Sequence, residues 1–144
     1  MKKGILAALA VILILTMPTS AFAGSVRITR INYDPPGSDT GSNWSLNHEY
    51  VVIHNFGATG KWLTGWTLRD AAGHIYRFRP YRLAARHSVV IHTGHGTNGP
   101  LNRYWNSSAY IWNNTGDTAT LRGRHGGFVD SCHYYGGPPG YKLC

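Results

Sequence analysis

Hydrophobic and polar residues alternate in short runs along most of the chain beyond residue 23. Trp66 and Leu68, for example, fall on one face of an extended chain, and the intervening Thr67 falls on the other. No run in this part keeps the apolar spacing of an amphipathic helix over three turns. The pattern predicts an all-β domain in which each sheet buries one face.

Several runs rich in Val, Ile, Thr, Tyr and Trp are predicted to be strands. They cover residues 26–31, 49–55, 65–69, 74–78, 88–93, 109–112, 118–122 and 128–134. Gly, Pro, Asn and Asp residues, which favour turns, separate these runs. The longest polar stretch, residues 37–46, is predicted to be a mobile loop.

The inward positions of these runs form one predicted core. Its members are Val51, Ile53, Trp66, Leu68, Tyr76, Phe78, Leu83, Val89, Ile91, Trp112, Ala119, Leu121 and Val129. Burial of apolar surface stabilises a fold by about 25 cal/mol per Å2, so a core of this size requires no cofactor. None is predicted.

The N-terminal segment, residues 1–23, is predicted to be a cleavable signal peptide. Two lysines precede an apolar run over residues 5–17, and Ala21 and Ala23 suit a signal peptidase that cuts before Gly24. The apolar run is shorter than the roughly 20 residues that span a bilayer, so no stable membrane anchor is expected after cleavage. A retained anchor is the alternative.

Residues 24–144 have the size of a single domain and are strongly basic. The full chain has a formal net charge of +8, of which the signal peptide carries two lysines, so +6 remains. An exported basic domain attracts anionic polymers such as DNA or a wall polymer, or else a protein partner. Solubility alone is another reason for such a charge, and no oligomeric state is predicted.

Both cysteines, Cys132 and Cys144, belong to the part predicted to be exported. An oxidising compartment favours a disulfide between them. The bridge closes a loop of about a dozen residues, contributes roughly 3 kcal/mol, and is expected to hold the Gly/Pro tail 136–141 against the last strand. Zinc binding by the thiols is the alternative, although no second cysteine pair accompanies them.

A series of motifs carries a resemblance to a known family. The motifs are LNHEYVVIHN at 46–55, LTGWTLRD at 63–70, Gly73-His74 with Phe78, the run 89–94, WNNTGD at 112–117 and VDS at 129–131. In this order, over about residues 45–136, they resemble the lamin tail domain family, particularly its small exported bacterial members. The resemblance implies an immunoglobulin-like β-sandwich that acts as a binding or scaffolding module. The basic stretch 79–87 departs from the family, whose members commonly read Phe-Pro and later Pro-Gly there.

Catalytic motifs are missing from the sequence. It has no Gly-x-Ser-x-Gly, His-Glu-x-x-His or Gly-x-x-x-x-Gly-Lys pattern, and its six acidic residues leave few pairs for acid–base work. Asp70, Asp117 and Asp130 are interpreted as turn carboxylates that accept bonds from nearby backbone N–H groups. No catalytic residue is predicted. The alternative function is a small secreted hydrolase, such as a nuclease that uses histidine and arginine.

One group of histidines has a spacing that suggests a metal site. His92 and His95, joined by His54 from a neighbouring strand, could meet one ion. His92 alternates with the apolar Ile91 and is therefore expected to face water. Solvated histidines are the simpler interpretation, and no metal is predicted.

Two clusters of basic residues are the candidate sites for polyanions. They are Arg77, Arg79, Arg82, Arg86 and His87 in the middle of the chain, and Arg122, Arg124 and His125 near a late turn. Arginine binds phosphates and carboxylates through pairs of parallel hydrogen bonds. Rings that could stack on bases lie nearby in the sequence, as in proteins that bind single-stranded nucleic acid. These rings are Tyr76, Tyr81, Tyr104 and Trp105. A solvated charged face is the alternative.

Overall fold

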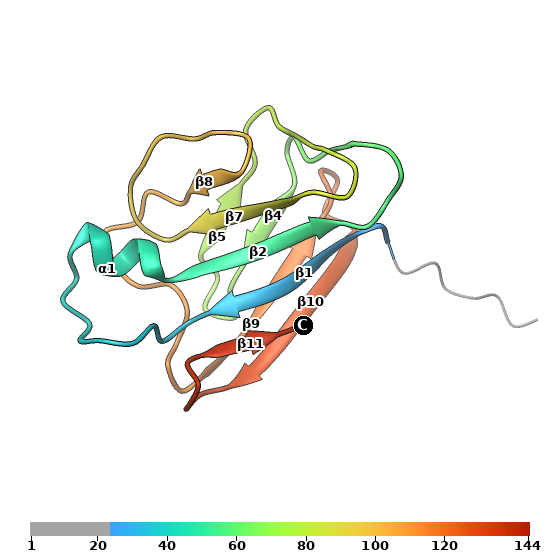
Figure 1. Ribbon diagram of the computed structural model, residues 1–144. Coiled ribbons are helices and arrows are strands. Elements are labelled where there is room, and N and C mark those ends of the chain that lie inside the picture. Colours follow the sequence, from blue (N-terminus) through green and yellow to red (C-terminus); the bar gives the residue numbers. More distant parts are fainter. Residues whose placement is uncertain (1–23) are drawn as a thin grey trace, which may run out of the picture.

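The computed structural model describes residues 24–144, which form two β-sheets packed face to face (Figure 1). One cluster of buried hydrophobic residues lies between the sheets, so the predicted immunoglobulin-like β-sandwich is confirmed. The predicted signal peptide, residues 1–23, lies outside the described residues. None of the helices within 24–144 has the length and apolar character needed to cross a membrane.

The larger sheet has five strands in the order β11-β1-β2-β7-β8. Their bounds are Val26–Asn32 for β1, Tyr50–Asn55 for β2, Ser88–His92 for β7, Asn102–Tyr104 for β8 and Tyr141–Leu143 for β11. Neighbouring strands pair antiparallel except for β7 and β8, which are parallel. The alternation of the sequence predicts β1, β2 and β7, whereas it misses the three-residue strands β8 and β11.

The second sheet has four strands in the order β10-β9-β4-β5. Their bounds are Thr67–Arg69 for β4, Ile75–Arg77 for β5, Gly116–Arg122 for β9 and Phe128–Tyr135 for β10. All four overlap predicted strands. A short pair, β3 (Lys61–Trp62) and β6 (Arg82–Leu83), lengthens the hairpin that contains β4 and β5.

The core agrees closely with the predicted set. Trp66 and Val129 are only partly buried and pack against its margin, while the other predicted core residues are buried. The predicted and observed cores agree because burial follows the alternation along the strands. In β9, for example, Asp117, Ala119 and Leu121 are buried and the residues between them are half-buried.

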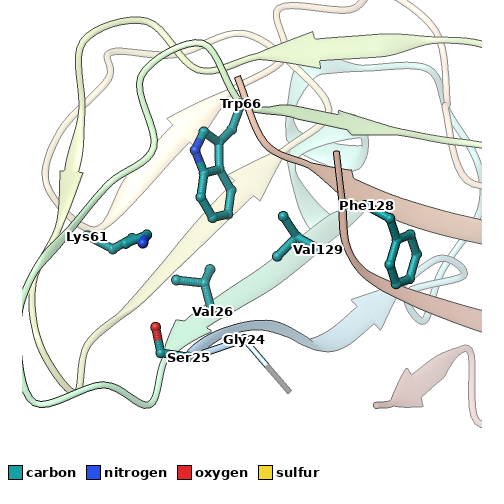
Figure 2. Close-up of a pocket in the computed structure, with 7 residues that line it drawn as sticks. All are labelled: Gly24, Ser25, Val26, Lys61, Trp66, Phe128 and Val129. Carbon is teal, nitrogen blue, oxygen red and sulfur yellow. The ribbon is translucent and has the colours of Figure 1, made fainter. Parts of the chain in front are cut away.

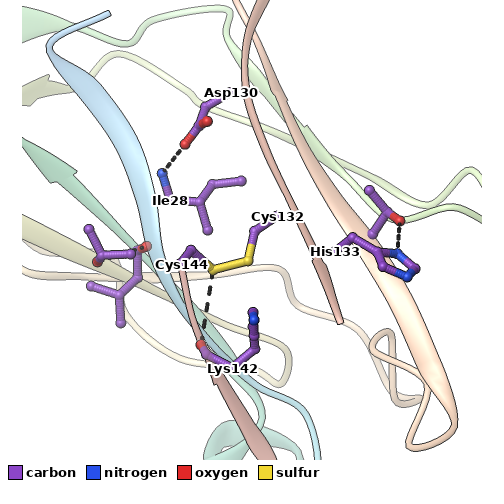
Figure 3. The surroundings of a disulfide bond; sticks show 9 residues. Ile28, Asp130, Cys132, His133, Lys142 and Cys144 are labelled. Atoms are coloured by element: carbon purple, nitrogen blue, oxygen red, sulfur yellow. Dashed lines mark hydrogen bonds between the residues drawn. A yellow bond between two sulfur atoms is a disulfide. The ribbon is translucent and has the colours of Figure 1, made fainter. Parts of the chain in front are cut away.

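The disulfide between Cys132 and Cys144 forms, with 5.9 Å between the two Cα atoms. Cys132 belongs to β10 and Cys144 directly follows β11, so the bridge joins the edge strands of two different sheets (Figure 3). Beside it, the Ile28 N–H donates to a carboxylate oxygen of Asp130 over 2.8 Å. The expected position of the tail was wrong: residues 141–143 pair with β1, not with the last long strand. The bridge therefore closes one side of the sandwich.

Two further expectations were wrong, each because a side chain satisfies backbone N–H groups. Residues 109–112 are not a strand, since the Ile111 N–H donates to the Glu49 carboxylate over 2.8 Å instead of joining a ladder. The predicted loop 37–46 leads into a short helix, α1 (Asn43–His48), whose first turn is capped by the Ser42 hydroxyl.

Candidate anion-binding surface

The hairpin over residues 61–83 positions the first basic cluster. The Leu63 N–H donates to the Tyr81 carbonyl and the Gly65 N–H to the Phe78 carbonyl, so its two arms remain antiparallel between the short strand pairs. Arg77 is exposed, while its neighbours Tyr76 and Phe78 are buried. Alternation along an extended chain therefore directs Arg77 to the outer face of the four-stranded sheet.

The sheet register brings the two basic clusters together. Thr67 on β4 is opposite Arg77 on one side and opposite Arg122 on the other. Directly opposite residues in antiparallel strands are about 5 Å apart, so both arginines flank the same threonine. The Arg77 guanidinium also donates to the Gly65 carbonyl over 3.2 Å, and a Cβ built at Gly65 would lie 3.3 Å from the Cβ of Arg124.

A further arginine, Arg69, belongs to this surface. It is opposite Ile75 and Thr120 on the neighbouring strands and alternates with the buried Leu68. Sequence reasoning did not connect Arg69 with a site. We call Arg69, Arg77, Arg122 and Arg124 the arginine face.

Acidic residues near the arginine face turn away from it. Asp70 and Asp117 are both 4% exposed. Asp70 accepts hydrogen bonds from the backbone N–H groups of Gly73 and His74 and from the His74 ring, and Asp117 accepts from the Ala71 N–H. This confirms the interpretation of Asp70 and Asp117 as turn carboxylates. The same interpretation was wrong for Asp130, which lies within β10 and accepts from the Ile28 N–H of β1. Over residues 24–144 no arginine forms an ion pair with a carboxylate.

Three other residues of the first cluster lie away from the arginine face. The Arg82 guanidinium packs against Gly60, the Arg86 N–H donates to the Asn55 carbonyl, and the His87 ring contacts the Ala85 carbonyl. These three residues therefore gather around the turn that follows β2. In the late cluster, His125 is exposed at the β9–β10 turn, where the Arg122 guanidinium donates to the Gly126 carbonyl.

A polar cavity of about 200 Å3 lies between the edge strands β5 and β8, on the side of the sandwich away from the disulfide. Its lining consists of Ile75, Tyr76, Arg77, Arg79, Asn98, Tyr104, Trp105 and Asn106. Arg77 is thus common to the cavity and to the arginine face. No acidic residue contributes to the lining.

The wall behind this cavity holds another cation. Arg103 is 8% exposed, and its guanidinium carbon lies 4.4 Å from the centroid of the Tyr81 ring. Burial raises the pKa of Tyr76, and the positive charges of Arg103 and Arg79 oppose that rise. The Tyr76 hydroxyl is therefore neutral at physiological pH, and the cavity is surrounded by positive charge.

The predicted stacking rings are mostly engaged in packing. Tyr104 stacks on His92 with ring centroids 5.1 Å apart and also packs against Gly96. Trp105 meets the edge of Trp112, and Tyr81 is buried. The rings hold the cavity wall in place, and this geometry does not favour base stacking on them.

A second cavity, of about 320 Å3, has a mixed polar and apolar lining (Figure 2). Its lining comprises Gly24, Ser25, Val26, Lys61, Trp66, Phe128 and Val129. The partial exposure of Trp66 and Val129 is explained by this cavity. Lys61 is the only cationic side chain in its lining, so it suits a polyanion less well than the arginine face.

The histidines suggested as metal ligands do not converge. His92 is opposite Tyr50 and His54 is opposite Ser88, which separates them by four residues, or about 13 Å, along paired strands. His95 contacts Ser108 instead. The described residues contain no group of three or more His, Cys, Asp or Glu side chains that could hold a metal ion.

Glu49 is a chemically unusual carboxyl that sequence reasoning did not single out as a site. It is fully buried, and burial raises its pKa to about 7. Such a shift is a common sign of catalysis. Glu49 lines neither of the cavities described above, however, and its hydrogen bonds connect it to the core.

Comparison with known proteins gives one family. The Lamin Tail Domain family model matches residues 19–136, which is most of the chain. The match ends directly after β10 and so excludes β11 and Cys144. A search of curated proteins finds no match.

Proposed function

The chain belongs to the lamin tail domain family, a family of non-enzymatic immunoglobulin-like modules, and we propose that it binds anionic polymers outside the cell. The arginine face carries this proposal. Three of its arginines belong to adjacent strands of one sheet, and none of the arginines within residues 24–144 forms an ion pair with a carboxylate. The guanidinium groups are therefore available to anions from solution.

An exported setting is part of the proposal. The sandwich is closed by a disulfide, and disulfides persist in oxidising compartments. The predicted signal peptide supports the same location. In that setting the available polyanions are released nucleic acid and phosphate-rich or carboxylate-rich wall polymers.

The test is polymer binding measured by fluorescence anisotropy over a range of salt concentrations. The variant replaces Arg69, Arg122 and Arg124 with Gln. The matched control replaces Arg27, Arg30 and Lys142, which belong to β1 and β11 of the other sheet, and so removes the same net charge.

The arginine-face variant is expected to bind a DNA oligonucleotide at least tenfold more weakly. Its plot of log affinity against log salt should be shallower by about 2, because each lost phosphate contact reduces the slope by about 0.7 to 0.9. Equal losses in the variant and the control would show that only net charge matters. The same DNA is inspected for cleavage, since fragments that depend on His92 or His125 would favour the nuclease alternative.

A further inference from the structure

We propose that the polar cavity between β5 and β8 is a binding site for a single phosphate group. The proposal rests on the proposed function and names the anion that the polymer presents. Its basis is the set of residues that line the cavity from two sheets.

Hydrogen-bond donors come from opposite walls of the cavity. Arg77 and Arg79 belong to the β5 side, and the amides of Asn98 and Asn106 belong to the β8 side. The side-chain oxygen of Asn98 accepts from the backbone N–H of Tyr104 over 2.9 Å. The side-chain NH2 group of Asn98 is left as a donor. Residues with guanidinium or amide N–H donors therefore line the cavity on both sides.

The shape of the anion follows from this arrangement. A carboxylate is planar and is satisfied by the fork of one arginine. A phosphate presents oxygens in a tetrahedron and can accept from donors on both walls at once. The cavity is also smaller than the 300–1,000 Å3 of ordinary small-molecule pockets, which suits one group of a polymer.

Arg103 provides an independent argument. A buried arginine is normally paired with a carboxylate, because an uncompensated buried charge is costly. Arg103 is 8% exposed, forms no ion pair with the described carboxylates, and has an Nε atom without a hydrogen-bond partner. Burial raises the pKa of Tyr76, which lines the cavity, and the hydrogen bond and positive charge of Arg103 oppose that rise. An anion bound in the cavity would supply the negative charge that this part of the core lacks.

The first experiment titrates the protein with inorganic phosphate and follows backbone amide and arginine Nε–H signals by NMR. Saturable shifts are expected at Arg77, Arg79, Asn98 and Asn106. Acetate at equal ionic strength should leave these signals in place. Shifts spread evenly over all arginines, or equal shifts with acetate, would overturn the assignment.

The second experiment uses Arg79→Gln, which changes an exposed residue outside the arginine face. Its matched control is Arg82→Gln on the same hairpin, where the side chain packs against Gly60 and not into the cavity. Arg79→Gln should abolish the phosphate shifts and weaken binding of a DNA oligonucleotide about tenfold or more, the usual effect of losing a charge-assisted hydrogen bond. Arg82→Gln should retain both.

Polyglutamate and poly(glycerol phosphate) separate the possible sources of the anion. Binding of poly(glycerol phosphate) should fall with Arg79→Gln as DNA binding does, whereas binding of polyglutamate should not change. An equal fall for polyglutamate would overturn phosphate selectivity. If Arg79→Gln has no effect while loss of the arginine face still weakens binding, the phosphate site is wrong and the proposed function stands. If none of the polymers binds, both are wrong.

Discussion

The buried carboxyl of Glu49 should make the stability of this protein depend on pH in an unusual direction. One of its oxygens accepts from the Thr93 hydroxyl at 2.6 Å and from the Ile111 N–H at 2.8 Å. The other oxygen is buried without a partner among the described residues. Burial raises the pKa of Glu49 from 4.5 to about 7, even though the two hydrogen bonds favour the ionised form.

The size of the effect follows from the linkage between protonation and folding. Each pKa unit corresponds to 1.36 kcal/mol, so a rise from 4.5 to about 7 corresponds to about 3 kcal/mol. Because the pKa is higher in the folded state, the folded protein holds the proton more tightly between these pH values. The resulting stability is complete below about pH 4.5 and is lost as the pH rises through about 7.

The perturbation is Glu49→Gln, which keeps an oxygen for Thr93 and Ile111 and cannot ionise. Urea unfolding at pH 4 and pH 8 measures the free energy of unfolding of both proteins. The difference between wild type and variant should change by about 3 kcal/mol over this range, to the disadvantage of the wild type at pH 8. Asp39→Asn is the control: this exposed carboxylate makes only the smallest contribution to the raised pKa of Glu49, so the variant should retain nearly all of the wild-type slope. Parallel pH profiles for the wild type and Glu49→Gln would refute the reasoning.

The remaining predictions concern the backbone and the disulfide. Arg86 has a φ of 59°, a left-handed conformation that glycine adopts at lower cost than a residue with a Cβ, so Arg86→Gly should raise the free energy of unfolding by about 1 kcal/mol. Ala85→Gly, at a residue without a positive φ, should bring no gain, and equal gains would contradict the explanation. Replacing Cys132 and Cys144 together with Ser should lower the free energy of unfolding by about 3 kcal/mol in urea, and an unchanged midpoint would refute a stabilising role.

Local pattern alone was enough for the long strands. β2, β7 and β9 alternate buried and half-buried residues over five to seven positions, and this period of two is visible in the sequence. The short strands β8 and β11 cover three residues each and carry no readable period. The helix α1 and the irregular stretch 109–112 were missed because they depend on individual hydrogen bonds from Ser42 and Glu49.

The candidate site was likewise only partly predictable from the sequence. Charge and residue type in the sequence identified Arg77, Arg79, Arg122 and Arg124 as candidates for anion binding. Their grouping required the register of β4 with both β5 and β9, which brings Arg77 and Arg122 to either side of Thr67. The same packing places Arg82, Arg86 and His87 around the turn that follows β2.

The chain's own alternation therefore established an all-β domain and most of its core. The sandwich architecture followed from the family resemblance, and the cysteine pair from the predicted export to an oxidising compartment. Assembly in three dimensions alone established the strand order, the arginine face and the cavity with Arg103 behind it. The physical reason is that alternation records which face of a segment avoids water. Pairing between distant segments depends on hydrogen bonds and side-chain fit that a single run does not contain.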